Sequence, residues 1–334
     1  MSDLKINNIT DRTGDSGPVF AGVSTVTSTG AFTVPVGPTE YRGGRGRAVI
    51  SGGFGPSIQS TMDKFEIATT GNATSFGSMA GVNAQSAMVA SSTRGVIGGY
   101  STPSPSTSMY YLTFSSDGGV SDFGNLQTAT REKQAGGNST RGLFEGGNPS
   151  LNTAIEFITI ATTGDGSHFG DLLGPMAQSG RINVSSPTRA IVTRGGTTAN
   201  ILEFITIATL GDAKDFGDLA NNCGEPCGTS NSTRAIFAGG YVSPTTFNTI
   251  SYVTIATAGN SVDFGDLSNK GNQFGGASSS TRSVFCGNLA PAGGIGNVME
   301  YVTIASTGNS SDFGDLTVKR AQACANSNVH GGLG

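Results

Sequence analysis

Tryptophan is absent from this chain of 334 residues, and histidine occurs only twice, as His168 and His330. Nucleophilic and acid–base catalysis need a base within reach of a nucleophile, together with a partner that orients the base. The two histidines fall at unrelated places in the chain, and no other residues suggest such a constellation. We therefore predict that the protein has no catalytic residues and is not an enzyme.

Cysteine is scarce and scattered. The four cysteines are Cys223, Cys227, Cys286 and Cys324, too few for a disulfide framework in a chain of this length. Only Cys223 and Cys227 are close together, and a zinc site there would need two further ligands. We expect buried thiols without a metal or other cofactor, and a local disulfide between Cys223 and Cys227 stays open.

Positive charge is also sparse: 19 Lys and Arg residues stand against 23 Asp and Glu residues, for a formal net charge of -4. No basic surface is expected to neutralise phosphates, so nucleic acid is not a predicted partner. No apolar run approaches the roughly 20 residues of a spanning helix, and residues 1–8 lack the features of a secretory signal. We expect neither membrane insertion nor export by a signal peptide.

Glycine, by contrast, is abundant, with 52 residues, and much of it belongs to an internal repeat. One repeated signature is EFITIATTGDGSHFGDL, as it stands at 156–172. Its Phe-Gly step occurs six times, at Phe76, Phe123, Phe169, Phe216, Phe264 and Phe313. A second signature is Arg followed by an apolar run and glycines, with the arginines Arg47, Arg94, Arg141, Arg189, Arg234 and Arg282. Successive arginines are 47, 47, 48, 45 and 48 residues apart, which is the usual length of a four-stranded propeller blade.

Each repeat contains four short extended segments separated by glycine turns. In EFITIAT both faces are largely apolar, as in a strand buried between two neighbouring sheets. The sequence therefore predicts an all-β fold, a six-bladed β-propeller over residues 44–334. The segment before Arg47 is a poor strand, so we expect residues 318–328 to complete the first blade and close the ring. The repeated phenylalanines are expected in the core.

These features resemble the kelch repeat: an apolar run, paired glycines, an extended aliphatic strand and an aromatic residue before a short step that ends in Leu. The usual kelch tryptophan is missing, and the phenylalanine of FGDL stands near its place. More specifically, the VTIA and FGDL units with their STR-containing links resemble a repeat in structural proteins of tailed phages that infect marine cyanobacteria. The segment NNITDRTGDSGPVFAGVSTVTSTGAFTVPVGPT at 7–39 resembles the N-terminal module of such proteins.

The resemblance implies a virion component that is assembled in the host cytoplasm, such as a tail fibre, a spike or another appendage subunit. Residues 1–43 then form a short β-rich arm that attaches to other virion proteins or to neighbouring subunits, and the protein is multimeric within the virion. The propeller would be displayed for binding to a host-surface glycan or protein. Two alternatives remain open, a carbohydrate-active enzyme on a propeller scaffold and a purely architectural capsid or tail subunit.

Candidate binding residues lie in the connections between the second and third segments, which vary most among the repeats. Phe54, Tyr100, Tyr241 and Phe247 are the aromatic candidates there, because loops on a rigid scaffold commonly carry recognition. The alternative is that these residues cover blade edges. The six arginines are interpreted as structural ties, with a ligand-binding ring as the alternative, and the aspartates beside the Phe-Gly steps are candidate partners for them.

Overall fold

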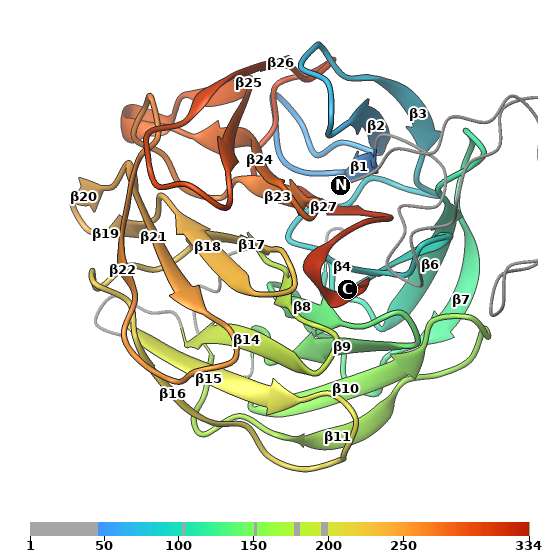
Figure 1. The fold of residues 1–334 in the computed structure, drawn as a ribbon. Coiled ribbons are helices and arrows are strands. Elements are labelled where there is room, and N and C mark those ends of the chain that lie inside the picture. Colours follow the sequence, from blue (N-terminus) through green and yellow to red (C-terminus); the bar gives the residue numbers. More distant parts are fainter. Residues whose placement is uncertain (1–45, 102–103, 150–151, 177–180, 195–199, 334) are drawn as a thin grey trace, which may run out of the picture. The chain divides into compact units, whose positions relative to one another are not determined.

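A computed structural model describes residues 46–101, 104–149, 152–176, 181–194 and 200–333. The chain divides into two units, Met1–Arg42 and Gly43–Gly334. The predicted arm at 1–43 lies outside the described residues. Within residues 46–333, six sheets surround a common axis, as Figure 1 shows. The predicted six-bladed β-propeller is thereby confirmed.

Every blade has four antiparallel strands, which are named below in order from the axis outwards. Blade 1 consists of β27 Cys324–Ser327, β1 Arg47–Ser51, β2 Thr61–Glu66 and β3 Thr74–Ser78. Blade 2 consists of β4 Ala87–Ala90, β5 Arg94–Gly98, β6 Ser108–Thr113 and β7 Ser121–Asn125. Blade 3 consists of β8 Gln134–Gly137, β9 Arg141–Glu145, β10 Ala154–Thr159 and β11 Ser167–Asp171.

The other three blades follow the same order, with small additions. Blade 4 consists of β13 Val184–Ser185, β14 Arg189–Arg194, β15 Ile201–Thr206 and β16 Lys214–Asp218, and β12 Arg181–Ile182 precedes it and pairs in parallel with β17. Blade 5 consists of β17 Cys227–Ser230, β18 Arg234–Ala238, β21 Thr249–Thr254 and β22 Val262–Asp266, with a hairpin of β19 Tyr241–Val242 and β20 Thr245–Thr246. Blade 6 consists of β23 Gly275–Ser278, β24 Arg282–Leu289, β25 Ile295–Thr303 and β26 Ser311–Asp315. Two short 3-10 turns are η1 Pro291–Gly293 and η2 Gly331–Leu333.

The ring closes through β27, which pairs with β1 from Ala48 opposite Ser327 to Ser51 opposite Cys324. The last strand in the chain is thus the innermost strand of the first blade. This confirms the closure predicted from the C-terminal segment. The first and last strands of the ring pair in one sheet. The ring is expected to unfold cooperatively, because the sheet of blade 1 needs both of these strands.

Each Phe-Gly step forms a β-bulge in the outermost strand. In blade 3, Ile155 lies opposite Gly170 and Glu156 lies opposite His168, so Phe169 is the extra residue. The same shift occurs in all six blades. A bulge leaves one residue out of the ladder and redirects its side chain. The six phenylalanines are all buried, each at most 3% exposed.

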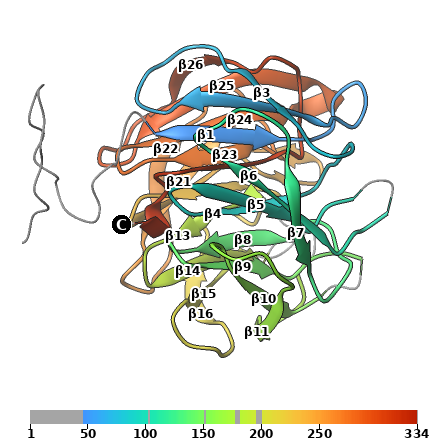
Figure 2. The same ribbon diagram turned by 90° about the vertical axis from the view of Figure 1, so that its right-hand side faces the viewer.

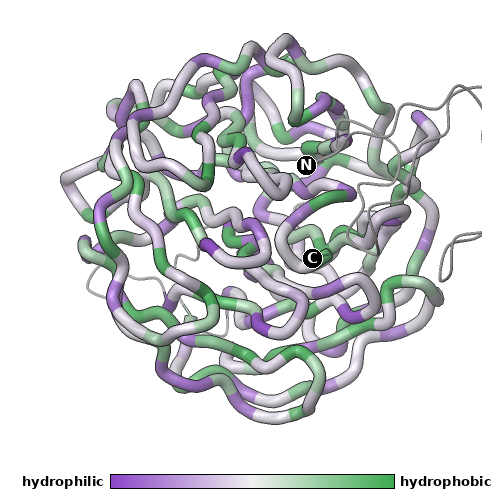
Figure 3. Tube along the Cα trace, in the orientation of Figure 1, coloured by the Kyte–Doolittle hydropathy of each residue, from purple (hydrophilic) through white to green (hydrophobic). Residues whose placement is uncertain are grey.

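The hydrophobic core consists of six clusters, each of which draws residues from two neighbouring blades. The cluster between blades 3 and 4, for example, contains Leu143 and Phe169 together with Val192 and Ile205. Figure 3 shows the corresponding pattern, with hydrophobic and hydrophilic stretches alternating around the whole ring. In the third strand of blade 3, Ile155 belongs to the cluster between blades 3 and 4 and Ile158 to the cluster between blades 2 and 3. Both faces of this strand are therefore packed, as the sequence predicts for a strand between two sheets.

The antiparallel order places the connections on two opposite faces of the ring. We call the face with the connections between second and third strands the loop face; the connections from each fourth strand to the next inner strand lie there too. The opposite face carries the turns before each repeated arginine, and we call it the C-terminal face because the chain ends there. Figure 2 shows the ring edge-on with the C-terminus at that face. No helix of the described residues is long and apolar enough to span a membrane.

Candidate functional site

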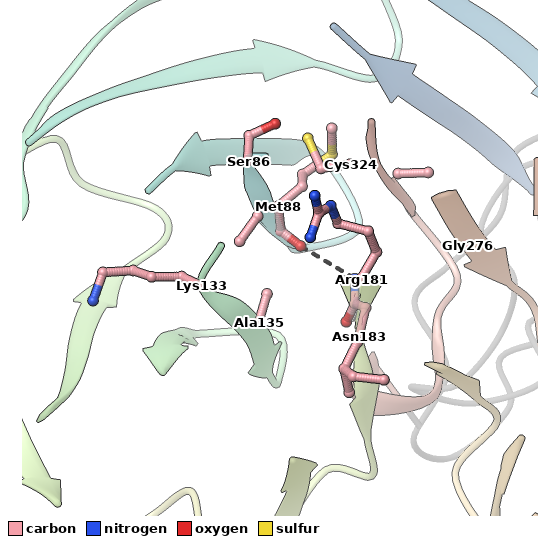
Figure 4. Close-up of a pocket in the computed structure, with 11 residues that line it drawn as sticks. Ser86, Met88, Lys133, Ala135, Arg181, Asn183, Gly276 and Cys324 are labelled. Carbon is pink, nitrogen blue, oxygen red and sulfur yellow. Dashed lines mark hydrogen bonds between the residues drawn. The ribbon is translucent and has the colours of Figure 1, made fainter. Parts of the chain in front are cut away.

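The centre of the ring is almost completely filled. The six inner strands are fully buried, and the cavity between them is only about 10 Å³. Figure 4 shows the Arg181 guanidinium directed towards Met88 and Cys324, and the side chain of Lys133 pointing away from it. Burial lowers the pKa of Arg181, while Glu225 and Glu132 act in the opposite direction. Among the described residues, the axis therefore holds the buried side chain of Arg181 with little open space beside it.

A ring of glutamines and glutamates surrounds the axis at the loop face. It consists of Gln85, Glu132, Glu225, Gln273 and Gln322, each two residues before an inner strand. All five have positive φ, between 56° and 61°, a region that non-glycine residues rarely occupy. Consecutive members are joined through the backbone, because the N–H of Glu132 donates to Gln85 and the N–H of Gln85 donates to Gln322. We call this feature the Gln/Glu ring.

Side chains add a second set of bonds to the Gln/Glu ring. The Gln85 amide donates to Glu132 across 2.5 Å, and the Gln273 amide donates to both oxygens of Glu225 across 2.9 Å. A strained backbone conformation persists only where the surrounding structure holds it in place. Here the hydrogen bonds between neighbouring blades hold the positive φ of these residues. The ring was not predicted from the sequence, although the repeated Gln or Glu two residues before the inner strand was a usable signal.

At the C-terminal face the end of the chain covers the axis. Nε2 of His330 lies 2.8 Å from the Ala90 carbonyl, and the N–H of Gly332 donates to Nδ1 of His330 across 3.2 Å. Because Nδ1 accepts, the proton of the neutral imidazole is assigned to Nε2. Burial lowers the pKa of His330 to about 4. This histidine is a neutral structural group, whereas His168 is exposed beside Asp171 in β11.

The six repeated arginines tie each blade to the next. Their guanidinium groups donate to backbone carbonyls that end the third strand of the following blade: Arg47 to Phe114, Arg94 to Ile160, Arg141 to Ile207, Arg189 to Ile255, Arg234 to Ile304, and Arg282 to Ile67. The last contact crosses from blade 6 to blade 1. Five of the six also stack over an aromatic ring of their own blade, such as Arg94 over Tyr111 at 4.3 Å.

The aspartates beside the Phe-Gly steps do not pair with these arginines among the described residues. Neighbouring blades are joined at the outer edge by other hydrogen bonds: the N–H of Gly164 donates to the Phe123 carbonyl, and the N–H of Asn125 donates to the Asp165 carboxylate. Equivalent contacts join all neighbouring blades at the outer edge. In the GDGSHFGD segment at 164–171, the turn at 164–166 contacts blade 2 and the remaining residues form β11. No group of three or more potential metal-ligating side chains occurs in the described part of the chain.

The predicted loop aromatics share the loop face but belong to blades on different sides of the ring. Phe54 in blade 1 is 43% exposed, while Tyr100 in blade 2 is only 9% exposed and packs against Tyr110. In blade 5, Tyr241 is half-buried in β19, and Phe247 packs against the cluster between blades 4 and 5. The structure therefore does not bring the four residues into one patch.

The four cysteines are buried free thiols. The structure thus contains no disulfide between Cys223 and Cys227. Burial raises the pKa of Cys223 and of Cys324 to about 11. A thiol with so high a pKa is a poor nucleophile and a poor metal ligand at neutral pH, because both roles require the thiolate.

At the level of the fold, the described residues form a six-bladed β-propeller. Comparisons with protein-family models and with curated proteins found no match to the chain. β-Propellers carry many unrelated functions, so the fold by itself assigns none.

Proposed function

We propose that the protein is a structural component of a phage virion, such as a tail fibre, spike or other appendage subunit, with the propeller displayed for binding. The likeness of the repeats and of segment 7–39 to phage structural proteins supports the virion role. On this proposal the kelch-like repeats build the displayed scaffold, and residues 1–43 attach it to other virion proteins.

The proposed binding role rests on one observation, the contrast between the regular ring and the variable connections on its loop face. The outer turns and the repeated arginines recur in each blade, and their hydrogen bonds are made to neighbouring blades. The connections between second and third strands differ among the blades. In blade 5 the connection 239–248 contains β19 and β20, whereas in blade 6 β24 and β25 are longer and only 290–294 separates them. A rigid scaffold with variable loops on one face is the usual arrangement of a recognition module.

Immunogold electron microscopy of purified particles tests the virion role. An antibody against the propeller is expected to label appendages outside the capsid, and peptides of the full chain are expected in the particle proteome. Absence of the chain from purified particles would exclude the proposal. Labelling restricted to the interior of the tail or capsid would instead favour the architectural alternative.

Binding to a host surface is tested separately, with the purified full-length chain on a glycan array and on intact host cells. Saturable binding that is blocked by an antibody against the loop face supports an adhesive role. Turnover of a bound glycan would favour the carbohydrate-active enzyme instead.

A further inference from the structure

Four blades carry a buried acid at the same position of their third strand. The acids are Asp63, Glu156, Glu203 and Glu300, each opposite the residue that precedes the bulged phenylalanine. All four side chains are at most 6% exposed. The corresponding residues of blades 2 and 5 are Tyr110 and Ser251. A carboxylate removed from water requires compensation by hydrogen bonds or by a cation.

Three of these acids are paired with a cation of the chain itself. Arg320 lies 3.1 Å from Asp63, Lys133 lies 3.3 Å from Glu156, and Arg194 lies 3.3 Å from Glu203. The cations come from three different positions of the repeat, so the pairing arises in three structurally independent ways. In blades 1 and 3 the cation reaches the same place, because Arg320 donates to the Gly52 carbonyl and Lys133 to the equivalent Gly146 carbonyl.

Glu300 in blade 6 is different. Its carboxylate accepts hydrogen bonds from the Ser268 N–H, from the Ser268 hydroxyl and from the Ser310 hydroxyl, and no ion pair reaches it from the described residues. The three positions that supply a cation elsewhere are occupied by residues that cannot do so. Gly271 stands at the position of Arg320, Phe274 at that of Lys133, and Gly287 at that of Arg194.

Blades 1, 3 and 4 have an internal cation beside the acid, whereas blade 6 has open space beside Glu300. A pocket of about 380 Å³ lies there on the loop face, between the chain that enters β23 and the hairpin of β24 and β25. Glu300, Phe274 and Asn288 line it, with Lys270, Pro291 and Val298 exposed around its rim. The pocket therefore combines a buried carboxylate with an aromatic wall and an amide, on the face where the loops vary.

We propose that this pocket binds a guanidinium or primary ammonium group from outside the chain, placed against Glu300 as Arg320 is placed against Asp63. A planar guanidinium fits a carboxylate in two-point contact and packs on an aromatic ring, which Phe274 provides. Free arginine has this chemistry, and so does an arginine side chain within a protein.

Calorimetric titration of the full-length chain with L-arginine and with L-citrulline tests the charge requirement. Citrulline has nearly the same shape as arginine but is neutral. Arginine is expected to bind saturably and at least about tenfold more tightly than citrulline, since one tenfold step corresponds to about 1.4 kcal/mol. Equal binding of the two, or no binding of arginine, would overturn the proposal.

Substitutions in and around the pocket test whether arginine binds there. Glu300→Gln is expected to abolish the preference for arginine over citrulline, and Val298→Trp, a change at the exposed rim, is expected to block the pocket while leaving Glu300 in place. Lys270→Ala is the matched control, for which arginine binding persists or tightens. If Val298→Trp binds arginine as the unmodified chain does, or if Lys270→Ala abolishes binding, the site is elsewhere or is an anion site.

Capped arginine distinguishes the two sources of the ligand. N-acetyl-L-arginine amide lacks the free ammonium and carboxylate groups of the amino acid, so it represents a side chain within a protein. Binding equal to that of free arginine points to a protein partner, whereas weaker binding points to a small zwitterion. The titrations with citrulline and with capped arginine both give binding constants. Their outcome does not depend on whether the chain is found in virions.

Discussion

At the scale of single residues, several buried charges are compensated by groups of a neighbouring blade or connection. Arg320 is the clearest case. It is fully buried and donates to the carbonyls of Gly52 and Thr61 and to the carboxylate of Asp63. Burial lowers the pKa of Arg320, and Asp63 acts in the opposite direction. Such a group contributes through the whole arrangement rather than through one contact.

We expect Arg320→Met to lower the free energy of unfolding by about 3–5 kcal/mol, because Asp63 is then left buried without its cation. The measurement is chemical denaturation of the full chain. The double variant Arg320→Met with Asp63→Asn is the control and should recover a substantial part of the loss, since it removes both charges. A double variant no more stable than the single one would show that the ion pair is not the cause.

The lowered pKa of the buried His330 is expected to make the stability of the protein depend on pH. Its pKa falls from 6.5 in the unfolded chain to about 4 in the fold, so the neutral form is favoured by folding. The resulting stability is fully present above pH 6.5 and is lost as the pH falls from 6.5 towards 4, by at most about 3 kcal/mol. Comparison of urea denaturation for the unmodified chain and for His330→Gln across this range isolates the effect.

The control for that comparison is His168→Gln, because His168 is exposed. This variant should follow the unmodified chain at every pH, whereas His330→Gln should show a shallower slope between pH 6.5 and 4. The assignment would be wrong if the two variants behaved alike.

At the scale of elements, the Phe-Gly bulge explains why the repeat contains this dipeptide. The bulge turns the phenylalanine into the core between two blades, and the glycine that follows lies against the outer turn of the next blade. Gly124 has φ 138°, and a Cβ placed on it would lie 2.4 Å from the carbonyl oxygen of Gly164. The glycine is required both by its backbone conformation and by this close approach.

Gly124→Ala is therefore expected to destabilise the protein by about 1–3 kcal/mol, through strain at positive φ and through displacement of the neighbouring turn. Thermal unfolding followed by circular dichroism measures the change. Gly81→Ala is the matched control, because Gly81 is exposed and an added Cβ there meets nothing within 4 Å. Equal effects of the two substitutions would remove the close approach as the explanation.

At the scale of the whole molecule, stability depends on joining the two ends of the ring. The strand β27 supplies Cys324 and Ala325 to the clusters that flank blade 1. Its Asn326 also donates to the Met88 carbonyl of the neighbouring blade 2, which accepts a second hydrogen bond from Asn183. The last strand thus joins blade 1 to the rest of the ring both at the sheet and at the axis.

A chain that ends at Gln322 lacks β27 and is expected to lose at least about 5 kcal/mol of stability in a single cooperative transition, an amount comparable to the whole stability of many domains. Differential scanning calorimetry measures it. A chain that ends at Asn328 keeps β27 and is expected to lose less, because only the cover over the axis is removed. A mild effect of the longer truncation would count against a cooperative closed ring.

The predicted arm leads to a test at the same scale. If residues 1–43 attach the protein to the virion, a chain without residues 1–40 should still unfold at the temperature of the full chain but should be missing from purified particles. Particle proteomics measures the second part. Normal incorporation of the shortened chain would contradict the attachment role.

Sequence alone determined the number of blades, the order of their strands and the closing segment, because each follows from a local pattern that is repeated six times. The arginines and phenylalanines of the repeat were recognisable for the same reason. The Gln/Glu ring was not found, since its meaning depends on backbone dihedral angles and on contacts between blades. The loop aromatics lie in connections of different blades, and their separation around the ring depends on which blade each belongs to.

Only the tertiary structure showed which of the four buried acids lacks a cation from the chain itself. Asp63, Glu156, Glu203 and Glu300 look alike in sequence, and their partners come from different positions of the chain. Compensation of a buried charge is a property of three-dimensional distance, so no spacing along the chain reveals that three of these acids have an internal cation and Glu300 does not. The periodic sequence specified the ring, and packing across it specified the pocket.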